Sequence, residues 1–278
     1  MTTPQIDQIL ADLDRIIDDS RRAKSRIGFF AAMYRQVTLR VQQGIEAGEF
    51  EDGPRMDLLD AVFAKRYIDA VDAWKAKGQP TRSWQTSFDV AEAGNRRLIL
   101  QHLLLGMNAH INLDLGIAAA EVAPGDAIDG LKRDFDHINV ILNDMLDSVQ
   151  KAIGKHSPMM HLLDQGGGAV GDQILGFSFP VVRFAAWMNA LVLARQSGNE
   201  KESTIDMMDR RAALAALPIV DPGGVVGKSI EGTIILAETQ DVVPVIDTLN
   251  SIITPGAAPK PVSKPADSSL FPALPSFP

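Results

Sequence analysis

The residues best suited to chemistry lie in the most continuously apolar stretch of the chain, residues 98–117, LILQHLLLGMNAHINLDLGI. Its polar side chains are His102, Asn108, His110, Asn112 and Asp114. A helix that is apolar on all sides belongs in a protein interior. A buried polar side chain without a partner costs roughly 1–3 kcal/mol. The stretch is therefore either an active or binding site or an unusually polar core.

Helix geometry divides these side chains into two flanks. At about 100° per residue, His110 and Asp114 fall on one flank at i, i+4, close enough to share a ligand or a hydrogen bond. Asn108 and Asn112 fall on the opposite flank, where we expect them to fix the helix to its neighbours. His102 lies about two turns from His110 and joins it only if the helix bends between them.

A second polar set, DFDHIN, lies at residues 134–139 in the next helix. Asp134 and His137, at i, i+3, share a face of that helix. The loop between the two helices is short, so an antiparallel hairpin would bring this pair to His110 and Asp114. Two His and two Asp would suit a divalent or iron(II) centre with open positions for water or substrate.

These residues lead to one main hypothesis, a small-molecule enzyme with a buried site between helices 98–117 and 127–150. The expected metal ligands are His110, Asp114, Asp134 and His137, and the expected cofactor is a divalent metal ion. His102, His110 and Asp114 are the expected catalytic acid/base groups. Metal-assisted hydrolysis or elimination is the least specific chemistry that this set allows.

Two alternatives stay open: a catalytic or ligand pocket without a metal, and a non-catalytic binding or scaffold protein whose polar core is structural. In the scaffold alternative, Arg66 neutralises a buried Asp114 without any metal. Other polar residues on apolar stripes are expected to be structural, among them Tyr34 and an i, i+4 cation–aromatic pair of Arg183 with Trp187.

The elements that position these residues are helical throughout. Apolar residues at helical spacing predict helices over residues 4–20, 26–47, 55–76, 84–104, 106–120, 127–153, 180–196, 200–216 and about 230–252. Segments 84–104 and 106–120 are one helix or two joined near Gly106, and Ser83 is a candidate N-cap. Residues 217–229 read as a Gly-rich loop, and 232–236 as a short extended piece. The predicted fold is all-α, a single globular bundle of about eight or nine helices around a buried central helix.

Composition sets the domain organisation and excludes several function classes. Residues 1–253 are expected to form the helical domain, and the Pro- and Ser-rich residues 254–278 a disordered tail. The net charge of −8 argues against sequence-independent binding of nucleic acid and of anionic lipid. The chain has no cysteine, which excludes disulfides and thiolate chemistry.

The polar side chains of 98–117 also argue against a membrane span. The N-terminal residues lack the basic start and apolar core of a signal peptide. A cytoplasmic protein with a small-molecule partner, and without nucleic-acid or membrane partners, is the expectation.

The run QHLLLGMNAHINLDL, with FAKRYIDAVDAW and AMYRQVT upstream and RDFDHIN downstream, resembles an uncharacterised bacterial all-helical family. The resemblance covers roughly residues 25–250. It implies a single all-α domain and no established activity, and it supplies no catalytic residues.

Overall fold

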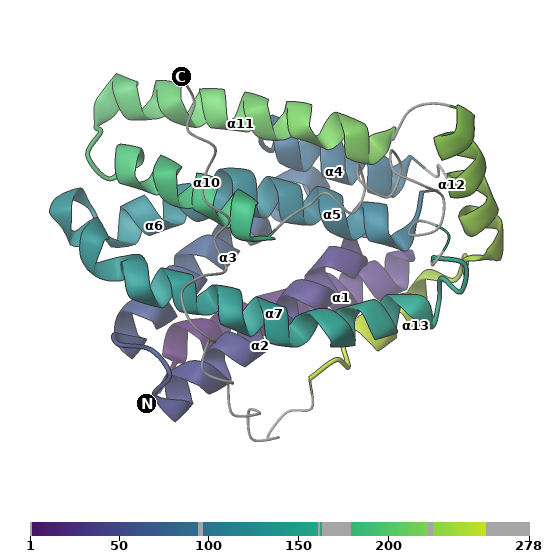
Figure 1. Ribbon diagram of the computed structural model, residues 1–278, viewed down its shortest axis with the longest axis horizontal. Coiled ribbons are helices and arrows are strands. Elements are labelled where there is room, and N and C mark those ends of the chain that lie inside the picture. Colours follow the sequence, from purple (N-terminus) through teal and green to yellow (C-terminus); the bar gives the residue numbers. More distant parts are fainter. Residues whose placement is uncertain (1, 94–96, 161, 163–178, 222–224, 254–278) are drawn as a thin grey trace.

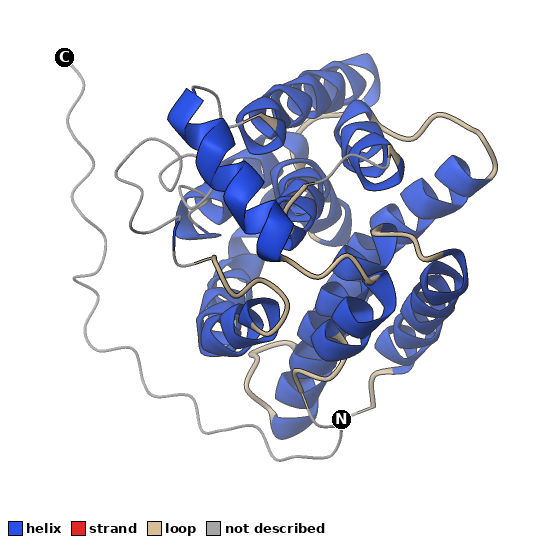
Figure 2. Ribbon diagram, turned by 90° about the vertical axis from the view of Figure 1, so that its right-hand side faces the viewer, coloured by secondary structure: helices blue, strands red, loops and turns tan. Residues whose placement is uncertain are grey.

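The computed structural model describes residues 2–93, 97–160, 162, 179–221 and 225–253. These residues form helices and connecting turns with no strand among them, which confirms the all-α prediction (Figures 1 and 2). The α-helices are α1 (Pro4–Ala23), α2 (Ile27–Ala47), α3 (Gly53–Lys75), α4 (Arg82–Glu92), α5 (Ile99–Ala109), α6 (Gly116–Val122), α7 (Lys132–Gly154), α10 (Phe179–Leu193), α11 (Gly198–Val220), α12 (Val225–Ala237) and α13 (Val242–Leu249). The predicted tail, 254–278, lies outside the described residues.

One continuous helix runs through the centre of the bundle. It consists of α5, the π-helical turn η1 (His110–Leu115) and α6. It packs against α2, α4 and α11 along α5, and against α3 and α10 farther on (Figure 1). By length and composition alone Ile99–Val122 could cross a membrane, but 94% of its most apolar window is buried inside the protein. The prediction of a buried central helix is confirmed.

The boundary between the helices at 84–104 and 106–120 differs from the prediction. The first helix ends at Glu92, and α5 begins at Ile99 and continues through Gly106. The start of α5 is fixed by side chains, because the Leu98 N–H donates to Gln101 Oε1 at 2.8 Å and the Ile99 N–H to Glu238 Oε2 at 3.0 Å. Gly106 does not break the helix; a Cβ there would overlap the ring of Phe30. This glycine lets α5 approach α2 closely.

The C-terminal helices also differ from their predicted bounds. Helix α11 continues through Pro218 to Val220, and α12 covers part of the expected Gly-rich loop together with the expected extended piece at 232–236. Helix α13 then begins separately, with the Asp241 carboxylate accepting from the Val243 N–H at 3.3 Å. Within α12, Ile234 and Ile235 are buried.

The cap of α4 comes from a distant helix. The backbone N–H groups of Arg82 and Ser83 donate to the carboxylate of Asp209 on α11, at 2.9 and 3.0 Å. The Ser83 hydroxyl donates to the same carboxylate at 3.0 Å. Ser83 therefore lies inside the helix, and the prediction that it is the N-cap is wrong. A carboxylate next to free N–H groups at a helix start is stabilising.

We expect Gly106→Ala to destabilise the protein by about 1–3 kcal/mol, because the added methyl group overlaps Phe30 in a close-packed interior. Urea unfolding followed by circular dichroism measures the change. Gly232→Ala in α12 is the matched control, since a Cβ there meets no atom within 4 Å. That control should be neutral or stabilise by roughly 0.5–1 kcal/mol. Equal effects of the two changes would contradict close packing at Gly106.

Candidate functional site

The two central residues of the predicted site lie in the π-helical turn η1. His110 begins this turn and Asp114 lies near its end, and both are almost fully buried. Single π-helical turns inside α-helices occur frequently at functional sites. Gly116 follows the turn, and a Cβ on it would lie 2.9 Å from the carbonyl oxygen of Ala186 on α10. The turn therefore sits where the central helix meets α10.

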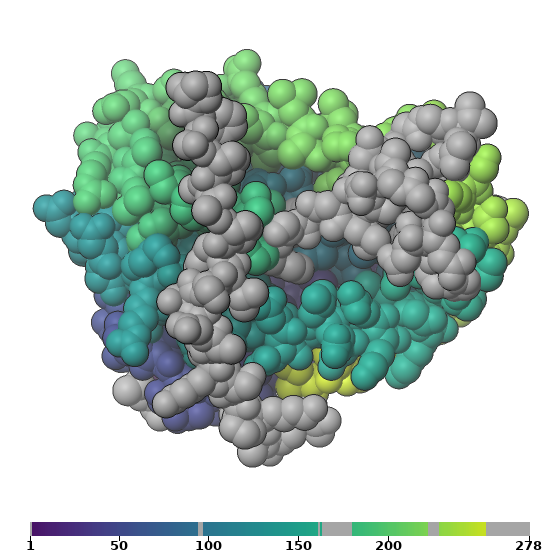
Figure 3. Space-filling model, viewed as in Figure 1, coloured from purple at the N-terminus to yellow at the C-terminus, as the bar shows by residue number. Residues whose placement is uncertain are grey.

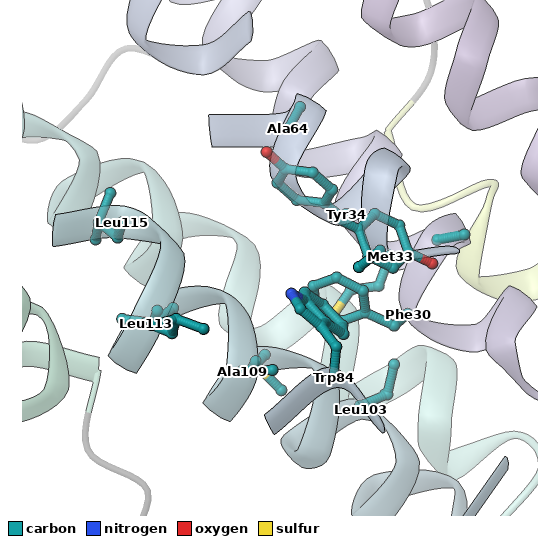
Figure 4. Packing of buried hydrophobic residues seen from close by; sticks show 14 of the residues in the cluster. Phe30, Met33, Tyr34, Ala64, Trp84, Leu103, Ala109, Leu113 and Leu115 are labelled. Atoms are coloured by element: carbon teal, nitrogen blue, oxygen red, sulfur yellow. The ribbon is translucent and has the colours of Figure 1, made fainter. Parts of the chain in front are cut away.

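Asp114 is a buried carboxylate with three side-chain partners. Its Oδ1 accepts from Arg66 Nε at 2.9 Å, and its Oδ2 accepts from Trp84 Nε1 at 2.8 Å. The same Oδ2 lies 3.2 Å from Nδ1 of His110. The pairing of Arg66 with Asp114 that the scaffold alternative predicts is therefore present. Three donors from α3, α4 and η1 converge on one carboxylate, and Figure 4 shows Trp84 with Phe30 and Tyr34 in this region.

This arrangement determines the tautomer of His110. A carboxylate paired with Arg66 is an acceptor, so Nδ1 of His110 carries the proton that faces it. Nε2 is then the ring nitrogen with the free lone pair. It is buried and has no hydrogen-bond partner. Burial lowers the pKa of His110, and this outweighs the opposing effect of Asp114, so the ring is neutral at pH 7.

Aromatic rings hold the imidazole in place. The ring of Phe63 stacks on His110 with centroids 3.5 Å apart and planes 7° from parallel. Tyr34 meets it edge-on at 4.5 Å. A ring fixed on one face, one edge and one nitrogen has no freedom to turn away, so the position of Nε2 is preorganised.

His110 forms part of the wall of a cavity of about 550 Å³. The cavity lies between α7 and the central helix, with α2 and α3 behind it and α10 at one end. In Figure 3 the surface is hollowed beside α7, and earlier parts of the chain are visible at depth. Most of the described lining side chains are aliphatic or aromatic; the polar ones among them are Tyr34, Asp60, His110, Asn143, Gln150 and Arg183.

Asp60 brings a second titratable group to this cavity. Its Oδ2 is buried without a hydrogen-bond partner. Burial, together with the nearby charge of Asp57, raises the pKa of Asp60 to about 7. Burial raises the pKa of the Tyr34 hydroxyl well above its usual value, and the negative charges of Asp60 and Asp114 raise it further. Two carboxyl groups thus lie near Tyr34. Asp114 is paired with Arg66, whereas Asp60 is protonated in part of the molecules and ionised in the rest at neutral pH.

The structure does not bring Asp134 and His137 to the other two predicted ligands. Asp134 accepts from the backbone N–H groups of Glu51 and Asp52 at 2.7 and 3.0 Å, and from Arg55 at 3.2 Å. It therefore ties the start of α7 to the turn between α2 and α3. His137 lies 3.5 Å from Glu49 and packs its ring on Phe50.

The expected hairpin does not form a metal centre. Helix α7 packs on α2 and α13, and the cavity separates it from the central helix. Within the described ranges no group of three or more His, Asp or Glu could hold a metal ion. The geometry therefore gives no support to a four-ligand centre, and the divalent metal stays a prediction from the sequence.

His102 does not join His110 either, since α5 continues through Gly106 without a break. Its ring is buried, packs on Phe29 with centroids 5.8 Å apart, and leaves both nitrogens without a partner. Burial and the charges of Arg26 and Arg97 lower the pKa of His102 to about 3. This histidine is a neutral core residue beside the site.

The remaining polar residues of the sequence analysis have defined partners. Asn108 Nδ2 donates to the Ala212 carbonyl of α11 at 2.8 Å, and Asn112 donates to Asn108 at 2.9 Å. The Asn flank thus fixes the helix to a neighbour, as predicted. The guanidinium of Arg183 lies over the ring of Phe135, 4.5 Å from its centroid, and Trp187 faces Lys132 instead. The predicted pairing of Arg183 with Trp187 is therefore wrong.

Sequence reasoning missed Phe63 as a stacking partner, Trp84 as a donor and Asp60 as a cavity group. Asp60 had a signal, because it is an acidic residue four positions after Met56 and three before Phe63 on an apolar face. Trp84 had none, since its partner lies 30 residues away in the chain.

Fold and site together define an all-helical protein in which His110, held by aromatic rings and paired with Asp114, lines a largely apolar cavity. The chain belongs to a family of unknown function, DUF5995, whose model matches residues 6–222. This match begins and ends earlier than the resemblance seen in the sequence. No curated protein and no solved structure matches the chain.

We expect the stability of the wild type and of Asp60→Asn to diverge with pH. Burial raises the folded-state pKa of Asp60 to about 7, above the ordinary aspartate value of 3.8. Protonated Asp60 therefore adds to the free energy of unfolding in full below about pH 4. This stabilisation is lost as the pH rises to about 7, because the buried carboxyl group must then ionise. Between pH 4 and 8 the variant should gain roughly 2–4 kcal/mol relative to wild type, measured by urea unfolding.

Asp69→Asn, an exposed change on the same helix, is the control for this series and should run parallel to wild type. Parallel curves for Asp60→Asn as well would show that Asp60 titrates normally.

Proposed function

We propose that this protein binds a small, largely apolar molecule in the α7 cavity and that His110 Nε2 accepts a hydrogen bond or a proton from it. One observation carries the proposal: His110 lines the cavity, and its Nε2 is buried without a partner while Nδ1 faces Asp114. An unpaired buried acceptor costs roughly 1–3 kcal/mol. A ligand with a donor group would remove that cost.

The cavity itself supports a ligand. Its volume of about 550 Å³ is within the ordinary range of small-molecule sites, which are lined mainly by apolar side chains with a few polar groups. The polar groups here lie on different walls, because His110 comes from η1, Asp60 from α3 and Arg183 from α10. They would orient a molecule as well as enclose it.

If the protein is an enzyme, His110 and Asp60 could act together as base and acid in an elimination reaction. Neutral His110 takes a proton from a carbon atom of the substrate. The electrons of the broken C–H bond form a double bond as the adjacent leaving group departs. Protonated Asp60, whose pKa is about 7, donates its proton to that leaving group. A base and an acid whose pKa values are tuned by their surroundings are typical of such sites. Asp114 acts by positioning His110.

The scaffold alternative also has an observation in its favour. Arg66 and Trp84 satisfy Asp114, so this part of the core is closed without any ligand. In that case His110 serves packing alone, and the cavity would not discriminate between ligands with and without a donor. The expected cytoplasmic location, and the expected lack of nucleic-acid and membrane partners, remain predictions from the sequence.

The proposal predicts a preference for donor-bearing ligands that depends on His110. Wild type should bind 4-butylphenol about tenfold more tightly than butylbenzene, because only the phenol can satisfy Nε2. His110→Phe keeps an aromatic ring on Phe63 but has no acceptor, and it should bind the two equally. Isothermal titration calorimetry measures both affinities.

His102→Phe is the matched control, a buried histidine outside the cavity lining, and should keep the wild-type preference. Binding of neither compound by the wild type, or an unchanged preference in His110→Phe, would overturn the proposal.

A further inference from the structure

The cavity contains a buried cation without a counter-ion. The side chain of Arg183, 4% exposed, lines the cavity at the end where α10 meets α7. Its Nη2 donates to the Phe135 carbonyl at 2.7 Å, and Nε has no partner. Among the described residues no carboxylate forms an ion pair with it. The charge of Asp136 acts to raise the pKa of Arg183, but the Asp136 carboxylate is paired with Lys132.

A buried charge without a partner lowers the stability of the folded protein. A cation removed from water is stabilised only when an anion and further hydrogen bonds replace the water. Burial lowers the pKa of Arg183 to about 10, so the group stays charged at pH 7. The single bond to the Phe135 carbonyl and the contact with the Phe135 ring hold the guanidinium in place and leave its charge uncompensated.

We propose that the ligand of the cavity is an elongated apolar carboxylic acid whose carboxylate is bound by Arg183. This deepens the proposed function and rests on it. A guanidinium offers a planar fork of donors that matches the two oxygens of a carboxylate. Arg183 is the one cation among the described lining residues, which suits a singly charged head group better than a phosphate.

The shape of the cavity indicates an elongated ligand. Its lining along α7 runs from Phe135 to Ile153, which spans roughly 27 Å at the rise of an α-helix. Arg183 sits beside Phe135 at one end of this row. From there the walls continue with aliphatic side chains such as Leu142 and Val149 on α7 and Leu103 on α5. The carboxylate would lie at the α10 end and the hydrocarbon chain along α7.

The test compares acids with alcohols of the same length on the full chain. Wild type should bind decanoate at least tenfold more tightly than 1-decanol in calorimetry. From octanoate to dodecanoate, each added methylene should improve affinity about fourfold. Arg183→Met, which can still pack on Phe135, should bind decanoate at least tenfold more weakly and lose the preference. Arg195→Met, the same change of charge on an exposed arginine, should behave like wild type.

A second variant keeps the inference testable if Arg183→Met fails to fold. Arg183→Lys keeps the positive charge and should retain a preference for the acid. Equal binding of acid and alcohol by wild type, or a full preference in a folded Arg183→Met, would overturn the carboxylate inference. So would tighter binding of decyl phosphate than of decanoate.

The proposed function is tested separately by the phenol pair. If the His110-dependent phenol preference holds while the acid preference fails, only the inference about Arg183 is wrong. If wild type binds none of the acids, alcohols or phenols, both proposals are wrong.

Discussion

The negative charge of Asp114 lies inside an otherwise apolar core, and the surrounding helices are arranged to compensate it. Arg66 from α3, Trp84 from α4 and His110 from the same π-helical turn all point donors at one carboxylate. Removal of one partner from a buried ion pair leaves an uncompensated charge and is strongly destabilising. The relative positions of α3, α4 and the central helix are therefore constrained by electrostatics as well as by packing.

The pairing with Asp114 occupies Nδ1 of His110 and leaves Nε2 without a hydrogen bond. Its Nδ1 serves the core, its ring is held between Phe63 and Tyr34, and its Nε2 has no partner. His102 also leaves both ring nitrogens without a partner, but His110 differs from it in lining the cavity. Arg183 presents a similar imbalance, a buried cation without an anion. Both residues line one cavity, so the proposed ligand would account for the two together.

Rules of local geometry predicted part of this arrangement, and long-range packing decided the rest. Helix geometry alone places His110 and Asp114 on the same face at i, i+4. The cost of burying the charge of Asp114 then calls for a cation such as Arg66. The placement of Asp134 and His137 failed because α7 packs on α2 and leaves a cavity beside the central helix. Gly106 was ambiguous for the same reason, since its role depends on Phe30, more than 70 residues earlier in the chain.

The π-helical turn also acts as a phase shift within the central helix. It holds one more residue per turn than an α-helix, so every side chain after it is rotated relative to those of α5. Gly116, which lets α10 approach to the Ala186 carbonyl, lies directly after this shift. If the same residues, His110 to Leu115, followed α-helical geometry instead, Gly116 would turn away from α10 and a larger side chain toward it. The angular setting of this turn thus couples the docking of α10, and with it Arg183, to the imidazole of His110.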